Sequence, residues 1–147
     1  MWTCPTCGHA FVTANIWHSC TRIGLDEPFA RAQPAVRDLF DGLVELFERC
    51  GPIVVIAQKT RIVFMVQVRF GGCLVRRDHL IANIALSRRV EHPRWSRIEE
   101  YGPRWIAHRW VVRTPEDLAG DDLAALVCEG YRDLGERGSL ARPYAEG

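Results

Sequence analysis

Four cysteine and histidine side chains near the start of the chain have the types and the spacing of a zinc site. Cys4 and Cys7 are two residues apart, with a proline between them and a glycine after, which is typical of the tight turn that places two thiolates on one metal ion. His18 and Cys20 follow after ten further residues and supply a nitrogen and a third sulfur. Four such ligands complete a tetrahedral Zn²⁺ site without an open position, so we expect the zinc to be structural.

Other assignments of these cysteines and histidines remain open. His9 competes with His18 as the fourth ligand, although its place next to the glycine of the turn aims it less well. The thiols could also be free. We expect a cytoplasmic chain, because its start lacks a basic stretch followed by an apolar one, and this favours metal binding or free thiols over a disulfide framework. The remaining three cysteines fall on expected apolar faces and are predicted to be buried small hydrophobic residues: Cys50, Cys73 and Cys128.

A second group of side chains has the chemistry of an anion site. The predicted ligand-binding residues are Lys59, Thr60, Arg61, Arg69, Arg77 and Arg109. Lys59 is the only lysine in the chain and stands beside a hydroxyl and a guanidinium, a combination that can grip a phosphate or a carboxylate. The alternative is a set of strand-edge charges that pair with acids of a helix.

The distribution of charge supports an anionic partner. The net charge of +1 is +8 over residues 59–113, −2 over residues 1–58 and −5 over residues 114–147. Aromatic residues interleave with the basic ones and could form a stacking and phosphate-binding surface: Trp95, Tyr101, Trp105 and Trp110. Nucleic acid is the first candidate partner and a small phosphorylated or carboxylated ligand the next. The alternative is that the tryptophans pack in the core and the arginines pair with acids of the same chain.

The elements that must position these residues follow from hydrophobic periodicity. Apolar residues from Val36 to Phe47 recur at helical spacing, and Leu118 to Leu134 repeat the pattern after a helix start at Thr114. Strands are expected near residues 53–56, 61–70, 73–77, 79–86 and 104–113, and a short helix over 93–100. The strict alternation over 61–70 predicts Ile62, Phe64, Val66 and Val68 on the helix-covered face and the arginines on the other. Gly71-Gly72 predicts a hairpin turn.

The predicted fold is therefore α+β, a two-layer antiparallel sheet of about five strands packed on two long helices. Residues 1–25 form a zinc-knuckle arm, 26–33 a connector, 34–140 the core domain and 141–147 a tail. The longest apolar run, residues 52–57, is far too short to span a membrane.

Several of these motifs together resemble a known family. The chain carries W-x-C-P-x-C-G at residues 2–8, H-S-C at 18–20, Q-K-T-R at 58–61 and Y-G-P at 101–103. With Phe11 and Asn15, these resemble a bacterial family of domains of unknown function, numbered 5655, from about Trp2 to the second long helix. That resemblance implies no activity. The order helix–strands–helix is also similar to the YdhG-like group of small α+β domains, some of which resemble frataxin.

The frataxin likeness provides an alternative function. Asp38, Asp41, Glu45 and Glu48 form an acidic stripe opposite the apolar face of the first helix, similar to the frataxin surface that engages iron and partner proteins. A solvated helix face explains the same pattern. No phosphate-loop, dinucleotide-glycine or catalytic-triad pattern is present, so we expect a binding module, with metal handling or a small enzymatic site at Lys59 as the alternative.

Overall fold

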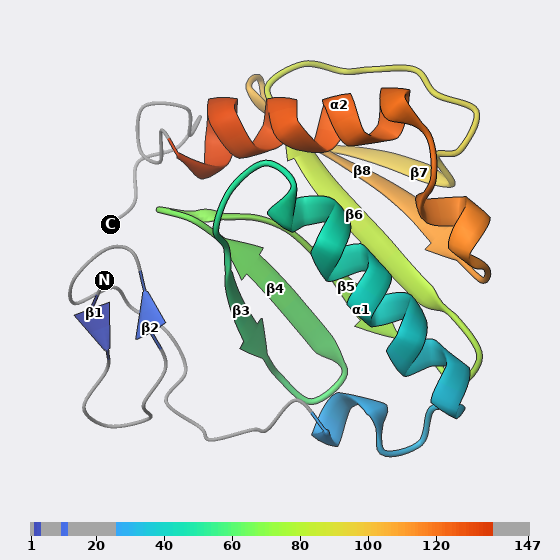
Figure 1. Cartoon of the computed structure of the whole chain (residues 1–147). Coiled ribbons are helices and arrows are strands. Elements are labelled where there is room, and N and C mark those ends of the chain that lie inside the picture. The colour runs from blue at the N-terminus through green and yellow to red at the C-terminus, as the bar shows by residue number, and fades with distance from the viewer. Residues whose placement is uncertain (1, 4–9, 12–25, 137–147) are drawn as a thin grey trace.

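A six-stranded antiparallel sheet with two helices on one side forms the core of the computed structural model, which describes residues 2–3, 10–11 and 26–136 (Figure 1). The strands lie in the order β3-β4-β5-β6-β8-β7. Their bounds are Val54–Ala57 (β3), Arg61–Met65 (β4), Arg69–Val75 (β5), Leu80–Leu86 (β6), Arg97–Gly102 (β7) and Trp105–Val112 (β8). The predicted α+β class is confirmed, with one strand more than expected.

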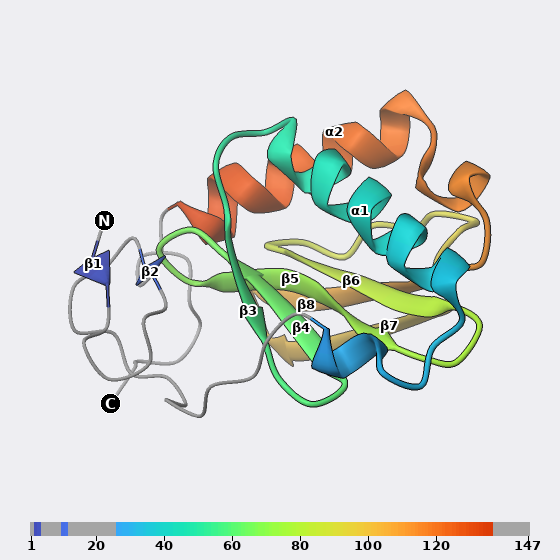
Figure 2. The same cartoon turned by 60° about the horizontal axis from the view of Figure 1, so that its bottom comes forward.

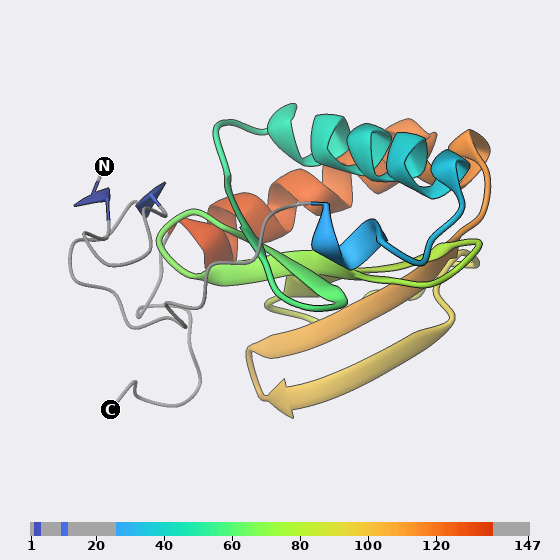
Figure 3. The same cartoon turned by 90° about the horizontal axis from the view of Figure 1, so that it is seen from below.

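The helices α1 (Pro34–Glu48) and α2 (Asp121–Gly130) cover the same face of the sheet, and no helix of the described residues covers the other (Figures 2 and 3). The predicted second helix is shorter than expected. A separate 3₁₀ turn, η2 (Pro115–Leu118), precedes α2, and a π-helical turn, η3 (Tyr131–Gly135), follows it. Gly120 separates η2 from α2 with a φ of 112°, which breaks the helical path. No helix in the described part of the chain is both long and apolar enough to cross a membrane.

The core lies between the helices and the sheet. Phe47 of α1 packs edge-on against Phe64 of β4, with ring centroids 4.7 Å apart, and also contacts Phe70 of β5 at 5.6 Å. Phe70 in turn meets Tyr131 at 5.6 Å. This aromatic chain joins α1 and the turn η3 to the sheet, and aromatic pairs of this kind contribute packing energy beyond their burial. The connector packs on the same core through η1 (Glu27–Phe29), where Phe29 lies 5.1 Å from Phe40.

Two predicted elements are wrong near the middle of the chain. The stretch 61–70 is two strands, because the chain turns at residues 66–68, and Gly71-Gly72 is not a hairpin turn but lies inside β5. Gly72 is required there for close backbone approach: its φ is +149° and a Cβ would lie 2.1 Å from the carbonyl oxygen of Ile62.

The predicted short helix over residues 93–100 is also wrong. Residues Arg97–Gly102 form β7, one of the two edge strands of the six-stranded sheet, which pairs only with β8. Edge strands tolerate charged residues because one of their sides stays in solvent, so β7 lacks the apolar alternation that marks an inner strand.

The prediction that Cys50 and Cys128 are free is wrong, because the two residues form a disulfide. The two sulfurs are bonded, and their Cα atoms lie 5.2 Å apart. Cys50 follows the end of α1 and Cys128 lies in α2, so the bond joins the two helices. Cys73 is a buried free cysteine, as expected.

Candidate functional site

The sheet face that the described helices leave uncovered carries the arginines, as the alternation in β4 predicts. Ile62 and Phe64 are fully buried beneath the helices, whereas Arg61 is exposed. Burying an unpaired guanidinium is costly, while the apolar side of β4 gives the helices a seat that needs no polar partners. The predicted orientation of this strand is confirmed.

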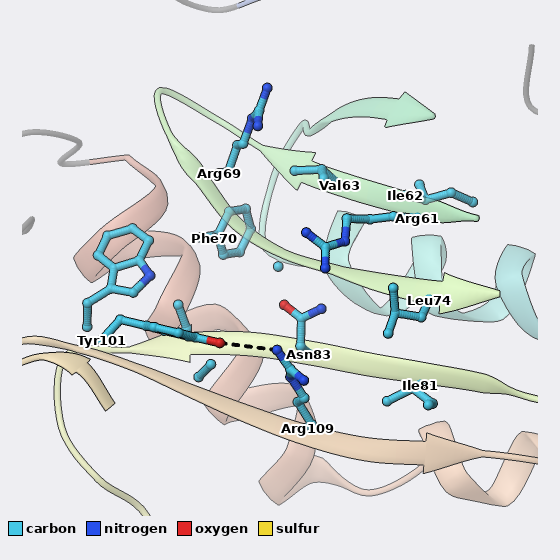
Figure 4. A pocket seen from close by; sticks show the side chains of 14 residues that line it. Arg61, Ile62, Val63, Arg69, Phe70, Leu74, Ile81, Asn83, Tyr101 and Arg109 are labelled. Carbon is cyan, nitrogen blue, oxygen red and sulfur yellow. Dashed lines mark hydrogen bonds between the residues drawn. The ribbon is translucent and has the colours of Figure 1, made fainter. Parts of the chain in front are cut away.

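A hollow of about 350 Å³ lies on this face, and we call it the open-face hollow. Three arginines from three strands line it: Arg61 of β4, Arg69 of β5 and Arg109 of β8. Arg61 and Arg109 extend toward its centre from opposite sides, Asn83 of β6 stands between them, and Arg69 lies at its rim (Figure 4). No carboxylate lines this hollow among the described residues.

The arginines of the hollow differ in how they are held. The Nη1 of Arg109 lies 3.0 Å from Oε1 of Glu99, and its Nη2 donates a hydrogen bond to the Tyr101 hydroxyl at 3.2 Å (Figure 4). Arg109 is therefore fixed in place with part of its charge neutralised. No carboxylate of the described residues lies within 4.0 Å of the Arg61 guanidinium, so its charge is available to a ligand.

The floor of the hollow is apolar and its wall is aromatic. Floor side chains come from four adjacent strands: Val63, Leu74, Ile81, Ala85 and Ala107. Trp105 and Tyr101 add aromatic surface near Arg109, and Tyr101 is 49% exposed. Such a surface can hold a molecule with an anionic group and an apolar or flat part, because guanidinium groups bind oxyanions bidentately and aromatic faces stack.

The structure divides the predicted ligand site into two. Lys59, Thr60 and Arg77 do not reach the open-face hollow but line a second hollow, of about 430 Å³. Side chains in a strand alternate between its faces, so Arg61 and its register partner Leu74 point to the open face while Val75 points to the other. Lys59 and Thr60 therefore line one hollow and Arg61, the next residue in the sequence, lines the other.

Asn83 is a lining residue of the open-face hollow that the sequence analysis did not identify. It is the only polar residue in β6 and occupies an outward position between apolar residues. The alternation of β6 could have identified Asn83, because residues two apart in a strand lie on the same face, and Asn83 therefore lies on the open face together with Ile81 and Ala85.

Two of the three described histidines, His92 and His108, have structural roles. His108 is fully buried, where its Nδ1 donates to a backbone carbonyl of β8 (3.0 Å) and its Nε2 accepts the backbone N–H of Val90 (3.1 Å). Burial lowers the pKa of His108, which keeps it neutral. His92 accepts the N–H of Arg94 on Nδ1 and contacts Asp122 through Nε2 at 2.7 Å, and this hydrogen bond lowers the pKa of Asp122. Both nitrogens of each ring are therefore engaged in contacts within the protein.

The predicted zinc ligands lie outside the described residues. Cys4, Cys7, His18 and Cys20, and the alternative His9, all lie there. Within the described ranges, no three His, Cys, Asp or Glu side chains are placed to hold a metal ion, and the acidic stripe of α1 faces solvent. Burial raises the pKa of the Cys73 thiol to about 12, so this cysteine is protonated and unsuited to ligation or nucleophilic attack.

Comparison with known proteins gives one match. A family model described as Domain of unknown function (DUF5655) matches residues 25–133, which include the whole sheet, both helices and both hollows. No curated protein and no solved structure matches the chain. The matched segment covers most of the chain, and the chain therefore belongs to the DUF5655 family.

Proposed function

We propose that this protein is a binding module whose open-face hollow holds a small organic anion, a phosphorylated or carboxylated molecule with a flat or apolar part. The observation that carries the proposal is the convergence of Arg61 and Arg109 on one hollow, with an amide between them and an apolar floor beneath. An anion placed between the two guanidinium groups would accept charge-assisted hydrogen bonds from both sides of the hollow.

The dimensions of the hollow favour a small ligand over nucleic acid, the first candidate from the sequence. Its volume of about 350 Å³ is that of a metabolite site, and its floor is apolar rather than lined by phosphate-spaced cations. Nucleic-acid binding through this face would instead show the strong salt dependence of phosphate-backbone contacts.

Calorimetric titration against a panel of anions tests the proposal. The panel contains inorganic phosphate, a sugar phosphate, a nucleoside monophosphate, an aromatic carboxylate and a single-stranded oligonucleotide at two salt concentrations. Arg61→Ala should weaken binding of the best small anion by about tenfold or more, since a hydrogen bond to a charged group contributes about 1.5–3 kcal/mol.

Arg49→Ala is the matched control, because Arg49 is an exposed arginine on the helix side of the protein. It should leave binding unchanged. Equal binding by the parent and Arg61→Ala would contradict the proposal, as would a panel in which only the oligonucleotide binds.

We also propose a structural Zn²⁺ on Cys4, Cys7, His18 and Cys20, with His9 as the alternative to His18. The support is the pairing of β1 (Trp2–Thr3) with β2 (Ala10–Phe11), in which Trp2 is opposite Phe11 and Thr3 opposite Ala10. This antiparallel pair flanks the Cys-x-x-Cys segment in sequence, the arrangement that small zinc-binding units use to present two thiolates from one turn.

A further inference from the structure

A second hollow, lined by Lys59, has four positively charged residues from three separate segments in its lining. Arg31 comes from the segment after η1, Lys59 from the β3–β4 turn, and Arg76 and Arg77 from the β5–β6 turn. Thr60 adds a hydroxyl, and apolar residues of the connector and β5 form its floor. We call this the connector hollow.

Backbone hydrogen bonds hold the three segments together. The N–H of Gln33, at the end of the connector, donates to the carbonyl oxygen of Arg77 at 2.7 Å. The N–H of Val75 donates to the carbonyl of Thr60 at 2.8 Å, which ties the β5–β6 end to the start of β4. The backbone that carries the cations is therefore already held in place, which limits the backbone entropy lost when a ligand binds.

The charges of the connector hollow are unbalanced. None of its four cations has a carboxylate within 4.0 Å among the described residues. The one acid in its lining is Glu27. Elsewhere in the described chain, arginines such as Arg37, Arg88 and Arg109 pair with acids. Like charges held near one another repel, and a bound anion would remove this repulsion.

The connector hollow is separate from the open-face hollow. Val75 lines the connector hollow and its neighbour Leu74 lines the open-face hollow, because successive side chains of a strand point to opposite faces of the sheet. Arg61 contributes to one hollow, Lys59 and Thr60 to the other, and no residue lines both. A ligand in one does not need the cations of the other.

We propose that the connector hollow is a second binding site, specific for the phosphate group of a phosphate-bearing ligand. Phosphate offers several oxygens to donors that approach from different directions, which suits guanidinium groups on two segments and an ammonium on a third. Lys59 supplies the compact point charge, which binds phosphate without the planar geometry that a guanidinium needs. The phosphate can belong to a soluble metabolite or to a nucleic-acid backbone, because both offer the same oxygens.

The single lysine makes the site directly observable. Lysine labelled with ¹³C at Cε gives one side-chain signal in the full chain, that of Lys59. Inorganic phosphate, pyrophosphate and a single-stranded twelve-nucleotide DNA are titrated in turn. A saturable shift of this signal is expected with at least one probe. Tighter binding of the DNA, with an affinity that falls steeply with salt, would identify a nucleic-acid backbone, and equal or tighter binding of pyrophosphate a soluble ligand.

Variants separate this site from the proposed open-face site. Arg77→Ala should weaken the binding reported by Lys59 by about tenfold, as expected for loss of a charge-assisted hydrogen bond, and Arg61→Ala should leave it unchanged. Lys59→Arg and Lys59→Ala, followed by calorimetry, should weaken the same binding to similar extents. The proposal is overturned if no probe shifts the lysine signal, or if the shift depends on Arg61 and not on Arg77. The first result leaves ligand binding in the open-face hollow untouched, whereas the second would assign the observed binding to the open-face hollow, which Arg61 lines.

Discussion

The bond between Cys50 and Cys128 should be a large single contribution to the stability of the core. It closes a loop with a sequence separation of 78 residues and joins the end of α1 to α2. Restricting a loop of this length in the unfolded chain is worth about 4.5 kcal/mol in the chain-entropy treatment. Total stabilities of domains are about 5–15 kcal/mol, so the bond supplies a substantial share.

Urea unfolding of three samples measures this contribution: the oxidised parent, the parent in reductant, and the double variant Cys50→Ala/Cys128→Ala. The oxidised parent should be more stable than the double variant by about 3–4 kcal/mol, which corresponds to a midpoint shift of roughly 1–3 M urea. The reduced parent should unfold close to the double variant. Peptide mapping without reductant should recover the segments around Cys50 and Cys128 as one linked species.

The double variant in reductant is the control for effects of the reductant elsewhere in the chain, and its unfolding midpoint should not move. The reasoning would be refuted if the oxidised parent and the double variant unfolded within about 1 kcal/mol of each other, since the closed loop would then restrict the unfolded chain little. Wherever the bond is reduced, the protein should show the stability of the reduced form.

Three further measurements test the structure. The free energy of unfolding should decrease as the pH is lowered from 7.5 to 5.5, because the pKa of buried His108 is lowered in the folded state and the unfolded state therefore binds more protons. His108→Gln should reduce the dependence of this free energy on pH, and an unchanged dependence would contradict a neutral His108 ring. Gly72→Ala should destabilise by more than about 2 kcal/mol in urea unfolding, because its Cβ would meet backbone, while Gly42→Ala in α1, facing only a flexible leucine, should stay within about 1 kcal/mol of the parent. Elemental analysis should find close to one zinc per chain. The double variant Cys4→Ser/Cys7→Ser should lose the zinc while its core stays folded, and unfolding of the whole variant would show that the predicted boundary of the arm is wrong.

The sequence by itself determined the features that depend on the local periodicity of apolar residues. The helical spacing of apolar residues in α1 predicts six buried positions: Val36, Leu39, Phe40, Leu43, Val44 and Phe47. Five of them are buried, and Leu46 is buried in place of the partly exposed Val44. The orientation of β4 follows from alternation, since only one of its faces offers helices an apolar seat. These patterns depend on the geometry of a single element, so a single sequence is enough to find them.

The positions of the candidate site residues depended on long-range pairing. The residues of the open-face hollow come from β4, β5, β6, β7 and β8, and no spacing in the sequence states that β8 lies beside β6. Lys59 and Arg61 are neighbours in sequence, yet the start of β4 sends them to different hollows. Periodicity can show which face of a strand is polar, but not which other strands complete that face.

Tertiary structure also decided the elements that the sequence patterns misassigned. Gly71-Gly72 has the composition of a turn, but its glycines are needed because the backbone of β4 and a ring of α1 approach β5 closely. Strand β7 is polar because it is an edge, and Cys50 bonds Cys128 because two helices distant in sequence pack side by side. In each case the role of the residue depends on a neighbour that is distant along the chain, and only the folded structure brings the two together.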